Sequence, residues 1–185
     1  GSGTVAIEAA LLATNRKPGL LRFNYAFMHL VGYDEKFYMD EFSKLEKQVA
    51  AVEGLKIIAT DISEDAVYIS KVNAGIAGVE EYIEFAVCDF EETTVDQDGN
   101  GIVYFNPKYG DRLGVEAELE ITYKRLGDFL KKKCKGYFGY IFTGNLELAK
   151  KIGLKPNRRI EFYTSKIDCR LLEYELYSGT KRTDK

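Results

Sequence analysis

The sequence predicts an α/β fold in a single domain over residues 1–185, with a mostly parallel sheet that ends in an antiparallel hairpin. Two observations lead to this prediction. Short β-branched runs alternate with helical patterns along the chain, which is typical of parallel strands joined by crossover helices. The last two apolar runs, 159–163 and 167–177, are joined by three residues, as expected of a hairpin on the edge of the sheet.

The first half of the chain is expected to contain two helical stretches followed by a strand, a helix and a strand. Apolar residues and strong helix formers fill the first stretch, and Pro18-Gly19 ends it. Ser63 is the expected N-cap of the helix that follows the first strand. The expected ranges are helix 5–13, helical pattern 23–52, strand 55–60, helix 64–77 and strand 82–87.

The second half begins with a polar, glycine-containing turn and continues as a strand that stops at Asn-Pro. Helical and apolar patterns then alternate until the closing hairpin. The expected ranges are turn 96–101, strand 102–105, helix 115–133, strand 136–142, helix 146–152 and strands 159–163 and 167–177.

Composition excludes several classes of protein. No stretch approaches the roughly 20 apolar residues of a membrane span, and no signal-peptide pattern is present. Three widely spaced cysteines and a single histidine, His29, argue against a disulfide framework and a metal site, and they favour a cytoplasmic protein. The net charge of −3 gives no overall support for nucleic acid. The lysine and arginine clusters at 131–135 and 150–159 are expected to be solvated helix ends, with contact to phosphate as the alternative.

Two candidate sites precede the middle of the chain. Gly1-Ser2-Gly3-Thr4 is a glycine-rich turn that opens a helix and lets backbone approach a ligand, although such a turn alone is weak evidence. Asp61 ends the first strand, where a carboxylate can accept both hydroxyls of a ribose. A helix-cap acid is an equally good interpretation of Asp61.

Asp89 and Phe90 end the next strand in the same way. A carboxylate there can accept a hydrogen bond from an adenine amino group while the ring covers the base. A solvated loop acid is the alternative interpretation.

The most specific pattern is Asn106-Pro107-Lys108-Tyr109, directly after a buried strand. An amide oxygen and a proline carbonyl can both accept from an amino group, while a tyrosine ring stacks on a flat base. That arrangement directs the nitrogen lone pair toward a methyl donor, and the chemistry is then largely positioning.

In this order, the patterns resemble class I S-adenosylmethionine-dependent amino methyltransferases. Three stretches resemble, more narrowly, the bacterial 23S rRNA guanine-N2 methyltransferases, whose full-length members carry a THUMP domain. The stretches are GSGTVAIEAALLA at 1–13, NPKYGDRLG at 106–114 and TGNLELAKKIGLKPNRRIEFYTSKIDCRLLEYELY at 143–177.

The resemblance implies a Rossmann-like class I methyltransferase fold and methyl transfer to the N2 amino group of a guanine in ribosomal RNA. It assigns the residues to two groups. Those expected to bind S-adenosylmethionine are Gly1, Gly3, Asp61, Ile62, Asp89 and Phe90, and those expected to hold the target amino group are Asn106, Pro107 and Tyr109.

The sequence departs from the family pattern in two ways. Lys108 replaces the second proline of Asn-Pro-Pro-Tyr and lacks its fixed φ. This predicts either a loop with less preorganisation and lower activity, or an outward Lys108 that meets RNA phosphate. Family members also carry a central strand and an RNA-binding THUMP region before Gly-Ser-Gly-Thr, so we expect the first strand to be missing and the sheet to need a partner segment.

Two other functions remain open at this point. One is an amino methyltransferase that acts on DNA adenine or protein glutamine, because these enzymes use related Asn/Asp-Pro-Pro-Tyr motifs. The other is a non-catalytic RNA-binding or scaffold domain whose site is degenerate at Lys108.

Overall fold

The computed structural model describes residues 1–96, 99–109, 116–164 and 167–177. The chain forms two compact units, Gly1–Thr93 and Thr94–Lys185, and each is described by itself. The expectation of a single domain over the whole chain stays a prediction.

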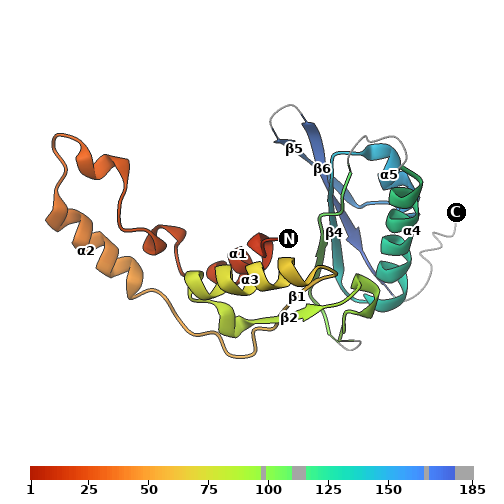
Figure 1. The fold of residues 1–185 in the computed structure, drawn as a ribbon, viewed down its shortest axis with the longest axis horizontal. Coiled ribbons are helices and arrows are strands. Elements are labelled where there is room, and N and C mark those ends of the chain that lie inside the picture. Colours follow the sequence, from red (N-terminus) through yellow and green to blue (C-terminus); the bar gives the residue numbers. More distant parts are fainter. Residues whose placement is uncertain (97–98, 110–115, 165–166, 178–185) are drawn as a thin grey trace, which may run out of the picture. The chain divides into compact units, whose positions relative to one another are not determined.

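The first unit contains a parallel pair of strands covered by two helices. β1 (Ile57–Asp61) pairs with β2 (Ile83–Val87) in a register that sets Asp61 beside Val87. The helices α1 (Thr4–Ala13) and α3 (Glu64–Ala77) contact both strands and lie on the same side of them (Figure 1). Parallel neighbours need a crossover, and α3 supplies it between β1 and β2. The strand–helix–strand order expected from the sequence is confirmed.

Both ends of α3 have a local cause. The Ser63 hydroxyl accepts a hydrogen bond from the backbone N–H of Ala66 at 3.3 Å, so the expected N-cap is confirmed. At the other end Gly78 has a φ of 67°, its N–H donates to the Gly75 carbonyl at 3.0 Å, and the Val79 N–H donates to the Ala74 carbonyl at 3.0 Å. The chain then turns through η3 (Glu80–Tyr82) into β2.

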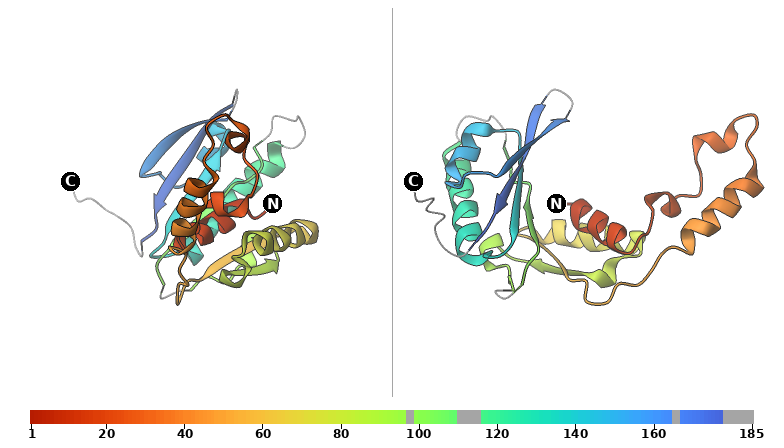
Figure 2. Two further views of the ribbon diagram at one scale, coloured as in Figure 1. Left: turned by 90° about the vertical axis from the view of Figure 1, so that its left-hand side faces the viewer. Right: turned by 180° about the vertical axis from the view of Figure 1, so that it is seen from behind.

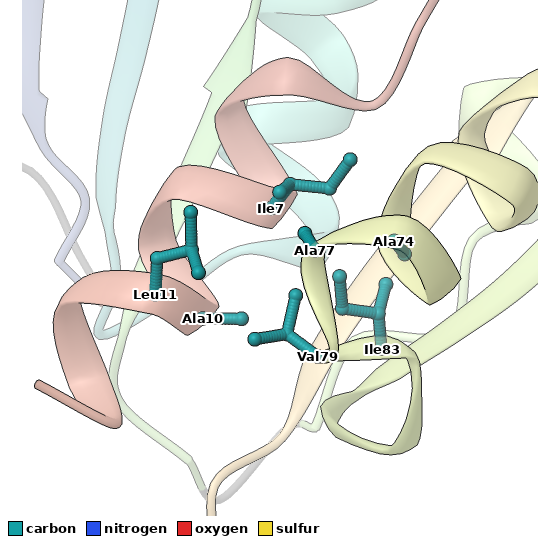
Figure 3. Close-up of a cluster of buried hydrophobic side chains, with 7 residues drawn as sticks. All are labelled: Ile7, Ala10, Leu11, Ala74, Ala77, Val79 and Ile83. Atoms are coloured by element: carbon teal, nitrogen blue, oxygen red, sulfur yellow. The ribbon is translucent and has the colours of Figure 1, made fainter. Parts of the chain in front are cut away.

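The core of the first unit is a small apolar cluster where α1 and α3 meet β2 (Figure 3). Ile7, Ala10 and Leu11 follow the i, i+3, i+4 spacing of one helix face. Burying an isoleucine or leucine side chain stabilises a fold by about 1.5–3 kcal/mol, and the alanines let the helices approach. The cluster comprises Ile7, Ala10, Leu11, Ala74, Ala77, Val79 and Ile83.

The segment between α1 and β1 differs from the expected helical pattern over 23–52. It forms the 3-10 turns η1 (Pro18–Leu21) and η2 (Ala26–His29) and then α2 (Glu35–Glu46). Gly32 has a φ of 93°, which stops helix propagation, and the Asp34 side chain caps α2. The expectation of one long helical stretch is wrong because this turn and cap interrupt it.

Aromatic rings hold that segment together. Phe27 lies against Tyr33 and Tyr38, with ring centroids 6.1 and 5.8 Å apart, and Phe42 contacts Tyr38 and Phe23. No residue of α2 is buried, and Figures 1 and 2 show this helix extending away from α1 and α3. The segment is therefore stabilised by its own neighbours more than by the core of the unit.

The second unit contains a four-stranded sheet in the order β3-β4-β6-β5. β3 (Ile102–Phe105) runs parallel to β4 (Phe138–Thr143), which pairs in antiparallel fashion with β6 (Ile167–Glu175). β5 (Arg158–Thr164) pairs with β6 as the expected antiparallel hairpin. The α/β class with parallel strands and a C-terminal hairpin is confirmed.

Two helices lie side by side on one face of this sheet, α4 (Glu116–Lys133) and α5 (Leu146–Lys151) (Figures 1 and 2). They pack so closely that a Cβ placed on Gly127 of α4 would lie 1.9 Å from the carbonyl oxygen of Ile152. The buried apolar residues of this unit are Leu119, Tyr123, Leu126, Phe129, Leu130, Cys134, Ile141, Leu148, Ile152, Cys169, Leu172, Tyr174 and Leu176.

Candidate active site

The glycine turn at the start of α1 is held against α3. Gly3 has a φ of 77°, a left-handed conformation that favours glycine, and a Cβ there would lie 2.9 Å from the Cβ of Ser70. The Ser70 hydroxyl donates to the carbonyl of Gly1 at 2.8 Å, and the Asn73 amide donates to that of Ser2 at 3.0 Å. Glycine at position 3 is therefore required by both backbone conformation and space.

Asp61 ends β1 beside this turn. Its carboxylate accepts a hydrogen bond from the backbone N–H of Ser63 at 3.0 Å and lies beside the backbone nitrogen of Gly1. Burial raises the pKa of this carboxyl, while the hydrogen bond from the backbone N–H of Ser63 lowers it. The N-cap of α3 is Ser63, and Asp61 lies two residues before it and accepts from the Ser63 N–H, so the helix-cap and ribose-binding interpretations of Asp61 both stay open. Ile62 follows and is 75% exposed.

Asp89 and Phe90 lie just past the end of β2. The Cys88 N–H donates to the Asp61 carbonyl at 3.1 Å, which continues the pairing of the two strands beyond their ends. Asp89 then caps a single 3-10 turn, η4 (Phe90–Glu92), by accepting from the Glu91 N–H at 3.0 Å. Asp89 and Phe90 are both half-buried, so Asp89 is a capping acid rather than a fully solvated one.

The Asn106–Tyr109 loop belongs to the second unit and follows β3 directly. Asn106 and Lys108 are exposed, whereas Pro107 and Tyr109 are half-buried. The Cys169 thiol on β6 donates to the Tyr109 hydroxyl with a sulfur–oxygen distance of 4.0 Å. Burial raises the pKa of Tyr109, and Cys169 raises it further, so the phenol is neutral at physiological pH. The last five residues of the NPKYGDRLG stretch lie outside the described residues.

The predicted residues thus fall into two groups, one in each unit. Gly1, Gly3 and Asp61 are brought together by the contacts of the turn, and Asp89 follows the strand that pairs with β1. Asn106, Pro107 and Tyr109 follow β3 in the other unit. Their roles in binding and catalysis stay predictions.

Several residues that support these groups were missed at the sequence level. Ser70 and Asn73 are spaced i, i+3 on α3, and a small polar residue at a buried helix position was the available signal. The Thr60 hydroxyl bonds that of Thr93 at 2.9 Å, a pair that no spacing rule predicts. Cys169 gave no signal beyond being a free cysteine on a strand.

Other groups considered in the sequence have local partners. The His29 ring bonds the Asn24 side chain at 2.9 Å at the surface. In the basic clusters, Lys150 pairs with Glu147 at 2.7 Å and Lys151 with Glu120 at 2.8 Å. These ion pairs favour the interpretation as solvated helix ends.

Two kinds of feature are absent from the described residues. No helix among them is both long and apolar enough to span a bilayer. No three histidine, cysteine or acidic side chains in those same ranges gather as metal ligands.

Residues 1–173 match the family described as RMKL-like, methyltransferase domain. A curated relative, the Ribosomal RNA large subunit methyltransferase K/L of Shewanella frigidimarina, is 34% identical over 189 residues, an alignment that covers 100% of this chain and 26% of that protein. The chain spans about a quarter of the length of the curated relatives it matches.

Two solved structures share the fold along nearly the whole chain. A possible methylase from Clostridium difficile 630 matches with a TM-score of 0.88 and 30% identity over 98% of this chain and 47% of that one. SMU.472, solved in complex with SAH, matches with a TM-score of 0.88 and 25% identity over 97% and 47%. These matches confirm the Rossmann-like class I methyltransferase fold. Because the family model covers residues 1–173 of the 185, the chain belongs to the family of RMKL-like methyltransferase domains.

Proposed function

We propose that this chain catalyses S-adenosylmethionine-dependent methyl transfer to the exocyclic N2 amino group of a guanine in 23S rRNA. The observation that carries the proposal is the loop after β3, where Asn106 is exposed and the half-buried Tyr109 has its hydroxyl 4.0 Å from the sulfur of Cys169. The curated relatives, named as methyltransferases of large-subunit ribosomal RNA, support RNA as the substrate and a cytoplasmic site of action. The SAH complex of SMU.472 supports the cofactor.

The first unit offers groups that fit the cofactor. Bound S-adenosylmethionine would supply an electrophilic methyl group. An ionised carboxylate has about four acceptor positions, so Asp61 keeps capacity for ribose hydroxyls after accepting from the Ser63 N–H. Ile62 presents exposed apolar surface beside it. We assign Gly1 and Gly3 to the cofactor turn by the same proposal.

Asp89 and Phe90 complete this group. One carboxylate oxygen of Asp89 accepts from the Glu91 N–H, and the carboxylate retains capacity to accept from an adenine amino group. The half-buried ring of Phe90 would cover the base.

The second unit supplies the groups for the target. The side-chain oxygen of Asn106 and the carbonyl of Pro107 would accept the two N–H bonds of the guanine amino group, while the Tyr109 ring stacks on the base. Fixing those bonds orients the nitrogen lone pair, and positioning of this kind needs no strong base. A neutral Tyr109 suits stacking because a phenolate would repel the electron-rich face of the base.

The experiment is transfer of a labelled methyl group from S-adenosylmethionine to large-subunit rRNA, followed by nucleoside mass spectrometry. We expect N2-methylguanosine, and we expect Asn106→Ala to lower the rate at least 100-fold. Asn100→Ala, which removes another exposed asparagine before β3, is the matched control. Label in DNA adenine or in protein glutamine would favour the other amino methyltransferases, and RNA binding without any label would favour a scaffold.

Lys108 divides the proposal into two testable forms. If the loop has lost preorganisation, Lys108→Pro raises the rate of transfer, since proline fixes φ. If the exposed Lys108 contacts phosphate, Lys108→Ala weakens RNA binding and flattens its dependence on salt.

The proposal includes a partner segment. Among the described residues, β1 pairs only with β2, so it presents backbone groups on its other edge. A further parallel strand would satisfy such groups, and a THUMP region would add RNA contacts. Fusing the segment that precedes the matched region in a longer relative should raise the midpoint of urea unfolding. An unchanged midpoint would contradict this part of the proposal.

A further inference from the structure

The two acids proposed to hold the cofactor are joined through a pair of threonine hydroxyls. Asp61 follows Thr60 at the end of β1, and the η4 turn that Asp89 caps ends at Thr93. The Oγ1 atoms of Thr60 and Thr93 lie 2.9 Å apart, within a normal hydrogen bond. Both side chains are half-buried, so the bond is partly shielded from competing water.

Backbone pairing between β1 and β2 fixes the position of Asp61, but Asp89 lies beyond the end of β2. The last backbone bond between them runs from the Cys88 N–H to the Asp61 carbonyl, one residue before Asp89. Beyond it the chain makes a single 3-10 turn closed by the Glu92 N–H to Asp89 and the Thr93 N–H to Phe90 bonds. A 3-10 turn of three residues has poor hydrogen-bond geometry and gains little rigidity by itself.

We propose that the Thr60–Thr93 pair is a positioning device that anchors the η4 turn to β1 and sets the placement of Asp89 relative to Asp61. Since Asp89 is the group assigned to the adenine amino group, the pair would determine the selectivity of the site for adenine over a base that lacks this donor. This inference rests on the proposed cofactor site and adds the residues that give it its geometry.

The test compares two ligands that differ at one position of the base. S-adenosylhomocysteine carries the 6-amino donor, and S-inosylhomocysteine carries a 6-oxo acceptor that a carboxylate disfavours. Calorimetry on the wild-type chain should give an affinity ratio of about tenfold or more in favour of the adenine compound, the size of a hydrogen bond to a charged group. Thr93→Val and Thr60→Val keep the side-chain shape but remove the hydroxyl, and each should reduce that ratio at least threefold.

Controls separate positioning from loss of stability. Thr93→Ser keeps a hydroxyl and should retain most of the wild-type ratio. Thr122→Val removes a threonine hydroxyl bonded to the Glu118 carbonyl on α4, and it should leave the ratio unchanged. Hydrogen exchange at the Glu92 and Thr93 amides should accelerate in Thr60→Val without any ligand, because the turn has lost its anchor.

The outcomes distinguish the two levels of proposal. If Thr93→Val weakens both ligands equally, or neither, while the wild type prefers the adenine compound, the positioning role is wrong and the proposed function stands. If the wild type binds both compounds equally well, Asp89 does not select for adenine, and the proposed role of the Thr60–Thr93 pair is wrong as well. If the wild type binds neither compound, the proposed cofactor site itself is wrong.

Discussion

Replacing Gly3 by alanine is expected to destabilise the first unit by about 2–5 kcal/mol, as the sum of two separate costs. A φ of 77° lies in the left-handed region, which costs an L-residue about 1–2 kcal/mol. The new Cβ would lie 2.9 Å from the Cβ and 3.0 Å from the Oγ of Ser70, and overpacking of this kind costs about 1–3 kcal/mol. The change is large against the roughly 5–15 kcal/mol that stabilises a typical domain.

A double-mutant cycle separates the two costs. Ser70→Gly removes the two side-chain atoms that the alanine would meet, leaving the Ser70 Cα at 3.3 Å, but it cannot relieve the backbone strain. We therefore expect Gly3→Ala to cost about 1–3 kcal/mol less in the Ser70→Gly background than in the wild type. The cycle corrects for the intrinsic cost of a glycine within α3 and for the lost hydrogen bond to the Gly1 carbonyl.

Urea unfolding followed by far-UV circular dichroism measures each free energy, which suits a chain that contains no tryptophan. The reasoning would be refuted in either of two ways. A cost of Gly3→Ala below about 0.5 kcal/mol would mean that the turn does not hold its left-handed conformation. Additive effects of the two substitutions, within about 0.5 kcal/mol, would mean that the turn does not pack against Ser70.

Three predictions concern the second unit. Gly127→Ala should destabilise the chain by about 3 kcal/mol or more, because the new Cβ would meet the rigid backbone oxygen of Ile152. A loss of about 3 kcal/mol lowers the thermal midpoint by more than about 2 °C, so a midpoint within about 2 °C of wild type would contradict this. Tyr123→Phe should cost about 1–3 kcal/mol, since the buried phenol and the Thr143 hydroxyl bond each other at 2.7 Å; an unchanged urea midpoint would count against that bond. Burial raises the pKa of Cys134 to about 12, so only about one thiol in ten thousand is ionised at pH 8. Iodoacetamide labelling read by peptide mass spectrometry should therefore reach Cys134 only in urea, and labelling at the unfolded rate in native buffer would overturn this expectation.

Local sequence rules predicted the regular elements well where one interaction decides the outcome. Ser63 is such a case, because an N-cap needs only its own helix. The prediction of helix over 23–52 was wrong for a related reason. The composition of this stretch favours helix, but Gly32 and the Asp34 cap determine where α2 begins. Hydrophobic periodicity is an average over many residues, so it does not reveal the effect of one glycine or one cap.

The candidate site was predicted only to the level of residues that meet a ligand. Asp61 and Asn106 were found because they follow apolar strands, and strand ends are readable in sequence. Thr60, Thr93 and Cys169 were not found, because their partners lie 33 or 60 residues away and depend on register. Long-range side-chain pairs of this kind require the fold before they can be recognised.

The ring contacts around α2 have a consequence for how the chain folds. They link residues between Phe23 and Phe42, so all of them close short loops, and no α2 residue is buried. Short loops form quickly and their loss exposes little core, so this segment should open and close without unfolding the cluster around Ile7. Native-state hydrogen exchange would then report α2 as a separate cooperative unit, with a lower opening free energy than α3.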